Sequence, residues 1–205
     1  MKVFIDLFSG MGGASKAFDE DPSWHVIKID NNPELLEHNR GLQLMDISET
    51  QEVIRMLESQ FQNGCHLNCD KLVIWASPPC QEFSWARADR MQGQTAEEFD
   101  LTLFESTRQI IEYFQPEIWI IENVHGAKPI FNEELELNPR QEIGSIVLWG
   151  EFPLIGIRTR DDWMHRKLEA KGSRTLRPNN RAIIPYAVSE GLRSAIDEQK
   201  TLFDF

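Results

Sequence analysis

Short apolar runs alternate with helical segments along the first 121 residues, and this alternation limits the possible folds more than any other feature. Patterns typical of buried strands occur at residues 2–8, 25–30, 71–76 and 117–121. Segments with helical spacing or helix-start signals separate them, at residues 13–18, 33–39, 49–61 and 99–114. Such crossovers bring successive strands parallel, so the sequence predicts an α/β fold with a doubly wound, mostly parallel sheet. Ligands then bind outside the carboxyl ends of the strands.

The chain length fits one compact domain. It has 205 residues, of which 41% are apolar, enough to bury a core. Beyond residue 129 prolines break up the pattern, until residues 185–196 form a last amphipathic helix. We expect a cofactor-binding and catalytic α/β domain at residues 1–150, a reduced basic region with a closing helix packed on it at 151–198, and a tail at 199–205.

Membrane insertion and secretion are not expected. No stretch approaches the ~20 apolar residues that span a bilayer, and the first residues lack the pattern of a signal peptide. Three cysteines do not make a disulfide framework in a chain of this length, which fits a reducing compartment. We therefore expect a cytoplasmic protein.

The charge is unevenly distributed. The net charge is −12, but residues 1–149 hold 11 basic and 25 acidic side chains, whereas residues 157–181 hold 8 basic and 3 acidic. A polyanion is therefore expected to meet the C-terminal third. An ordinary solvated basic loop is the alternative interpretation of that segment.

Acidic and glycine residues follow the first predicted strands. Residues 6–13, DLFSGMGG, place three glycines where a tight turn lets backbone approach a ligand, although a plain strand-to-helix turn would also explain them. Asp30 ends the second strand, where a carboxylate can accept both hydroxyls of a ribose, so a nucleoside-containing cofactor is favoured. Asp46, after the next apolar patch, can accept from an adenine amine or be an unpaired surface aspartate.

A cysteine and a glutamate follow the third and fourth predicted strands. Residues 77–84, SPPCQEFS, present Cys80 behind two prolines, each of which fixes a φ angle and removes a backbone donor. Rigid presentation suits a nucleophile. The alternative is that Cys80 fills a gap in the core, as free cysteines usually do. Glu122 lies at the same predicted edge, and packing does not explain a carboxylate after the apolar EIWII run. Both are candidate site residues.

These segments together resemble the DNA cytosine-5 methyltransferases. DLFSGMGG looks like their cofactor loop, SPPCQEFS like their catalytic Pro-Cys-Gln motif and IENV, at residues 121–124, like their Glu-Asn-Val motif, in the family's order. The resemblance covers roughly residues 1–126, and it implies a bacterial or phage-infected cell as the source. It implies the Rossmann-like fold of S-adenosylmethionine-dependent methyltransferases, with S-adenosylmethionine as the methyl donor. The cofactor residues it implies are Phe8, Gly10, Gly12, Asp30, Asp46, Pro79 and Leu103.

The resemblance also implies a mechanism on DNA. The thiolate of Cys80 adds to C6 of a cytosine, C5 becomes nucleophilic and takes the methyl group, and loss of the C5 proton with thiol elimination restores the ring. Glu122 holds the base at N3. The base must leave its stack to reach both groups. Residues 84–100 are either a loop that closes over it or a simple connection.

The C-terminal third departs from the family pattern. Of the family's Gln-x-Arg-x-Arg element only Arg158 and Arg160 match, and we expect these arginines to contact phosphate or the base carbonyl. Residues 180–185 loosely resemble the closing element. The ~20 residues between the arginine element and the closing element are too few for an ordinary target-recognition region. The enzyme therefore recognises little sequence, takes specificity from a partner, or uses a different nucleic acid.

The tail suggests a partner. Gln199, Leu202, Phe203 and Phe205 resemble the peptides by which replication enzymes dock on a sliding clamp, although a helix end that tucks its phenylalanines onto the core is the alternative. A zinc site at Cys65, His66 and Cys69 is disfavoured, because no second ligand pair follows. Two other functions remain as rivals: methylation of cytosine in RNA, and a non-catalytic cofactor-binding or DNA-mimicking interaction protein.

Overall fold

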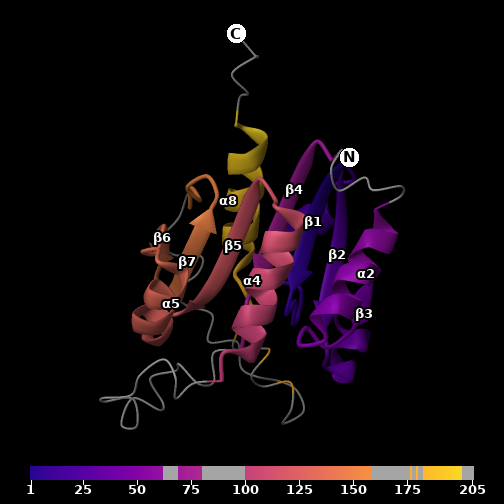
Figure 1. Ribbon diagram of the computed structural model, residues 1–205. Coiled ribbons are helices and arrows are strands. Elements are labelled where there is room, and N and C mark those ends of the chain that lie inside the picture. The colour runs from indigo at the N-terminus through magenta and orange to yellow at the C-terminus, as the bar shows by residue number, and fades with distance from the viewer. Residues whose placement is uncertain (62–68, 80–99, 158–175, 177–178, 180–181, 200–205) are drawn as a thin grey trace.

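A seven-stranded sheet forms the centre of the computed structural model, which describes residues 1–61, 69–79, 100–157, 176, 179 and 182–199 (Figure 1). The strand order is β3-β2-β1-β4-β5-β7-β6. The strands are β1 Lys2–Leu7, β2 Trp24–Asp30, β3 Leu42–Leu44, β4 Lys71–Ala76, β5 Ile118–Val124, β6 Gln141–Ile143 and β7 Ile146–Glu151.

The first five strands are parallel, and β7 runs antiparallel between β5 and β6. The connecting helices are α1 Lys16–Asp19, the 3₁₀ turn η1 Pro33–Glu37, α2 Thr50–Gln60, α4 Thr102–Phe114, the 3₁₀ turn η6 His125–Ala127, α5 Lys128–Leu135 and α8 Tyr186–Asp197. This topology confirms the predicted doubly wound, mostly parallel sheet.

Helices cover both faces of the sheet. Figure 1 shows α2, α4 and α5 in front of the strands and α8 behind them. Successive residues of β1 point to opposite faces, so Phe4 packs with Phe18 of α1 and Leu192 of α8, whereas Ile5 packs with Leu57 of α2 and Ile110 of α4. Because both faces are buried, the central strands are mostly apolar.

The predicted elements up to residue 121 agree with the structure, although most of their ends are shifted. Strand β5 continues to Val124, three residues beyond the predicted end at residue 121, because residues 122–124 pair with β7 after pairing with β4 has stopped. Helix α1 is shorter than predicted, and residues 33–37 form a 3₁₀ turn.

Three elements after residue 127 are absent from the sequence prediction: α5, β6 and β7. The described residues of the C-terminal third nevertheless pack on the same sheet, since Phe152, Ile155 and Ile184 join the core beneath α8. Leu176 packs with Leu35 and Leu42 near η1. No helix in the described ranges is long and apolar enough to cross a membrane.

Candidate functional site

The strand order reverses direction between β1 and β4, and parallel sheets bind ligands at such a point. Leu7 pairs with Ile29 of β2 on one side and with Ala76 of β4 on the other. Ala76 in turn pairs with Ile121 of β5. The residues one step further along these four strands therefore emerge side by side at the carboxyl edge; they are Phe8, Asp30, Ser77 and Glu122.

The glycine turn, residues 8–13, follows β1 at this edge and has an unusual backbone. Phe8, Gly10 and Gly12 have φ angles of 60°, 51° and 74°, in the left-handed region. Phenylalanine rarely adopts this conformation, and such strain is concentrated at functional sites. A Cβ atom on Gly13 would lie 2.5 Å from the carbonyl oxygen of Ile184, so the close approach of the chain before α8 requires glycine there.

Asp30 and Asn39 hold the glycine turn in place. The two carboxylate oxygens of Asp30 accept hydrogen bonds from the backbone N–H groups of Gly10 and Asn32, each at 3.0 Å. The buried Asn39 amide donates to the Ser9 hydroxyl at 3.1 Å and to the Gly10 carbonyl at 3.0 Å. A carboxylate has about four acceptor positions, so Asp30 keeps capacity for ligand hydroxyls while its orientation is fixed.

Asp46 lies just beyond β3, exposed but not unpaired. Its Oδ1 accepts from the Ser48 backbone N–H at 2.9 Å and from the Ser48 hydroxyl at 2.7 Å, and its Oδ2 accepts from the Asn31 amide at 3.2 Å. These bonds, those from Ser48 above all, hold the pKa of Asp46 below its usual value. The group is therefore an oriented carboxylate close to the end of β2.

Glu122 is the half-buried carboxyl group of β5, and its pKa is raised to about 7. Burial is the cause, and a hydrogen bond with the Ser77 side chain acts in the opposite direction. The indole N–H of Trp75 donates to the Ser77 hydroxyl at 2.8 Å, which leaves the hydroxyl proton for Glu122. At neutral pH Glu122 can therefore hold a proton or accept one.

Asn123 fixes the chain that leads to the cysteine. Its buried amide donates to the carbonyl oxygen of Pro78 at 3.0 Å, and the Ser77 N–H donates to the Leu7 carbonyl at 3.2 Å. Pro79 follows, exposed, and is the last described residue before Cys80. A bond from β5 thus holds the segment at Pro78, two residues before Cys80.

Two apolar residues predicted for the cofactor site pack on one cluster. Phe8 and Leu103, the latter in the first turn of α4, are half-buried and contact the core formed by β1, β2, β4, α2 and α4. Cys69 packs against the same cluster.

Several predicted residues lie outside the described part of the chain. They are the nucleophile candidate Cys80, the arginines Arg158 and Arg160, most of the 84–100 segment, Cys65 and His66. Of the basic segment, Asn179 is described, and its side-chain oxygen accepts from the Asn32 amide at 3.5 Å, beside the glycine turn.

Sequence reasoning assigned no role to four buried or half-buried polar residues of this region: Asp6, Asn39, Ser77 and Asn123. Only Asp6 carried a visible signal, as a charge inside an apolar strand. Burial raises its pKa to about 7, although Ser15 and Lys28 lower it, and its Oδ2 has no hydrogen-bond partner among the described residues. The other three act on chain segments that only the fold brings near them.

Comparison with known proteins identifies the family. The model of the C-5 cytosine-specific DNA methylase family matches residues 2–136. The chain belongs to this family. The matched range includes the glycine turn, Asp30, Asp46, the Pro-Cys-Gln segment, Leu103 and Glu122.

Individual C-5 cytosine-specific DNA methylase relatives are longer than this chain. A type II methyltransferase of Haemophilus parahaemolyticus, M1.HphI, is 30% identical over 123 residues, which are 60% of this chain and 32% of that protein. A probable DNA (cytosine-5)-methyltransferase of Frog virus 3 is 27% identical over 128 residues, 58% of this chain and 52% of that protein.

Among solved structures, a putative DNA modification methyltransferase encoded within an E. coli prophage matches with a TM-score of 0.42 and 22% identity, over 66% of this chain and 37% of that one. The chain thus spans about a third to a half of the length of the curated methyltransferases that it matches.

Proposed function

We propose that the chain transfers a methyl group from S-adenosylmethionine to C5 of cytosine in DNA, through a covalent adduct on Cys80. The observation that carries this proposal is that two groups lie at the same carboxyl edge of the sheet, at the ends of strands separated only by β4. One is a strained glycine turn bonded to Asp30; the other is Glu122, whose pKa is near 7. Membership of the cytosine-5 family gives these groups their chemical meaning.

The residues at the carboxyl edge fit S-adenosylmethionine. The oriented carboxylates of Asp30 and Asp46 suit the hydroxyl and amine donors of a nucleoside, and a sulfonium cation is compatible with this acidic edge. Phe8, Gly10, Gly12, Pro79 and Leu103 complete the proposed set. When bound, the sulfonium supplies the methyl group.

Cys80 is the proposed nucleophile. Its thiolate forms an Sγ–C6 bond, and the electron pair displaced from the C5–C6 double bond makes C5 reactive toward the methyl group. A base then removes the C5 proton, and the electron pair of that C–H bond reforms the double bond while the thiolate leaves C6. The hydrogen bond from Asn123 to Pro78 fixes the segment just before the cysteine.

Glu122 is the proposed partner of the base. In its protonated form it donates to N3 and reduces the negative charge that develops as the thiolate adds. Its pKa of about 7 makes this form available at neutral pH. The target base has to be flipped out of the duplex, at a cost of a few kcal/mol, and Arg158 and Arg160 are proposed to contact phosphate or the base carbonyl.

Trapping with DNA that contains 5-fluorocytosine tests this mechanism. Fluorine at C5 cannot leave as a proton does, so the Cys80 adduct persists and appears as a shifted band under denaturing conditions. We expect an adduct with the wild-type chain and S-adenosylmethionine, none with Cys80→Ala, and an unchanged adduct with Cys65→Ala.

The substrate is tested in the same assay with fluorinated RNA. An adduct with RNA and none with DNA would make the chain an RNA methyltransferase. No adduct with either, in protein that binds the cofactor, would favour the non-catalytic interaction protein.

We also propose that the C-terminal tail tethers the enzyme to a sliding clamp. Of the residues involved, Gln199 is described and exposed, whereas Leu202, Phe203 and Phe205 lie outside the described residues. Tethering raises the local DNA concentration and so compensates for the repulsion between DNA and a chain with a net charge of −12. A specificity partner that binds DNA would have the same effect. Deletion of residues 202–205 is expected to abolish capture by an immobilised clamp; unchanged capture would contradict this role.

A further inference from the structure

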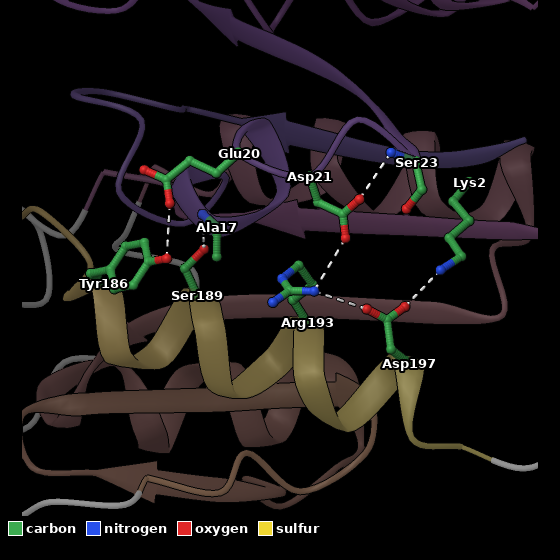
Figure 2. Close-up of polar contacts among 9 residues, drawn as sticks. All are labelled: Lys2, Ala17, Glu20, Asp21, Ser23, Tyr186, Ser189, Arg193 and Asp197. Carbon is green, nitrogen blue, oxygen red and sulfur yellow. Dashed lines mark hydrogen bonds and ion pairs between the residues drawn. The ribbon is translucent and has the colours of Figure 1, made fainter.

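Ser189 connects the last helix to the chain immediately after the glycine turn. Its buried hydroxyl donates to the carbonyl oxygen of Ala14 at 2.6 Å and accepts from the backbone N–H of Ala17 at 3.0 Å. Figure 2 shows the Ser189 side chain of α8 pointing at Ala17. One side chain thus bonds to two backbone groups that precede it by more than 170 residues.

These two bonds satisfy a need at the start of α1. The first N–H groups of a helix have no partner within the helix, and a side chain at the preceding position usually accepts from one of them. Ser15 occupies that position, but its side chain makes no capping bond; its hydroxyl instead donates to the Gly12 carbonyl at 3.4 Å. Ser189 therefore supplies from α8 the acceptor that α1 lacks locally.

The chain before α8 also contacts the turn directly, at Gly13. A Cβ atom there would lie 2.5 Å and 2.8 Å from the backbone oxygen and nitrogen of Ile184. Asp30 and Asn39 bond to the turn upstream, at Gly10. The glycine turn is thus fixed at Gly10 by Asp30 and Asn39 and at Gly13 by the chain before α8, while Ser189 of α8 holds the residues that follow the turn.

The other polar contacts of α8 in Figure 2 do not reach this backbone. The Tyr186 hydroxyl donates to Glu20 at 2.9 Å, and Arg193 pairs with Asp21 at 3.2 Å. Both involve exposed or half-buried side chains beyond the turn, and exposed pairs contribute little to stability. They therefore provide matched controls on the same helix.

We propose that Ser189 is a positioning residue for cofactor binding: by fixing residues 14–17 it holds the glycine turn in its binding conformation. The inference rests on the proposed function, because it takes the turn to be the cofactor site. It assigns to the C-terminal helix a role in a cofactor site whose proposed lining residues all lie between Phe8 and Leu103.

Hydrogen exchange and cofactor binding together test this role in the full chain. In Ser189→Ala the Ala17 amide loses its acceptor, so we expect its exchange to accelerate about tenfold relative to the Ile5 amide in β1, which reports on global opening. We expect the Kd for S-adenosylhomocysteine, the demethylated cofactor, to rise about three- to tenfold. Tyr186→Phe is expected to change neither quantity. The inference would be overturned if the exchange rate of the Ala17 amide, relative to that of the Ile5 amide, were the same in Ser189→Ala and in wild type.

A second pair of variants keeps the test decisive if Ser189→Ala fails to fold. Ser189→Thr keeps the hydroxyl and Ser189→Val replaces it with a methyl group of the same size, so both add equal bulk. If Ser189→Thr binds the cofactor more tightly than Ser189→Val, the inference is supported. If the two variants bind it equally, the inference is overturned. Wild-type protein that binds no cofactor would overturn the proposed function as well, whereas normal wild-type binding with an unaffected Ser189→Ala would overturn only the role of Ser189.

Discussion

Three carboxyl groups of one small region differ in pKa because their surroundings differ. Asp46 is exposed and accepts bonds from Ser48 and Asn31, so its pKa is lowered. Burial raises the pKa of Glu122, which is half-buried, and of Asp6, which is fully buried, to about 7. Asp46 is therefore suited to accept hydrogen bonds as an anion, whereas Glu122 is suited to exchange a proton at neutral pH.

The pH dependence of methyl transfer tests the role of Glu122. If its protonated form holds N3, activity should fall as the pH rises through about 7. Glu122→Gln cannot titrate and cannot share a proton, so we expect it to lose roughly 10²- to 10⁴-fold in rate and to lack this falling limb. The measurement is kcat against pH for both proteins. If kcat of Glu122→Gln still falls as the pH rises through about 7, the titration of Glu122 is not the cause of that fall.

Asp6 should affect stability rather than chemistry. Its pKa is about 7 in the fold and 3.8 as the ordinary value, so the folded state binds the proton more tightly. Stability from this group is then complete below pH 4 and is lost as the pH rises toward and through 7, with a slope of at most ~1.4 kcal/mol per pH unit. Asp6→Asn should therefore gain stability relative to wild type between pH 5 and 8. Urea unfolding at several pH values measures this difference; a constant difference would contradict it.

At the scale of elements, the glycine turn depends on close contact with the chain before α8. Gly13→Ala forces a Cβ atom onto the Ile184 backbone, so we expect a loss of about 1–3 kcal/mol in unfolding free energy. Gly156→Ala is the matched control, because nothing lies within 4 Å of its added Cβ. Urea denaturation compares the two. Equal stability of both variants would show that the contact at Gly13 relaxes freely.

The elements that sequence reasoning predicted are those with a strong local pattern. Strand β4 agrees at both ends, because KLVIWA is an apolar run bounded by polar residues. Strand β6 was missed because a three-residue edge strand has too few residues to show an alternation. Strand β7 was also missed, although its IVLW run is an apolar signal like that of β4. The extension of β5 through Glu122 depends on pairing with β7, which no local pattern contains.

The same limit applies to the candidate site. Asp30 and Glu122 were predicted because each ends an apolar run with a charge. Asn39, Asn123 and Ser189 were not, because their partners at Gly10, Pro78 and Ala17 become neighbours only when the sheet has formed.

At the scale of the molecule, α8 is part of the main core although it lies outside the family match. Its Val188, Leu192 and Ile196 are fully buried with residues of β1, β4 and β5. Each such side chain contributes about 1.5–3 kcal/mol, and a domain has about 5–15 kcal/mol in total. A chain ending at residue 184 should therefore be largely unfolded by circular dichroism, whereas a chain ending at residue 199 should keep wild-type stability. A folded shorter chain would contradict this account.

The bonds between Ser189 and the chain around Ala17 have a consequence for the order of folding. They join groups that lie 172 and 175 residues apart in the sequence, so they close a longer loop, at a greater cost in chain entropy, than the pairing of β1 with β2. The N-terminal strands can therefore pair first, but the loop that is proposed to hold the methyl donor is completed only when α8 packs on the sheet.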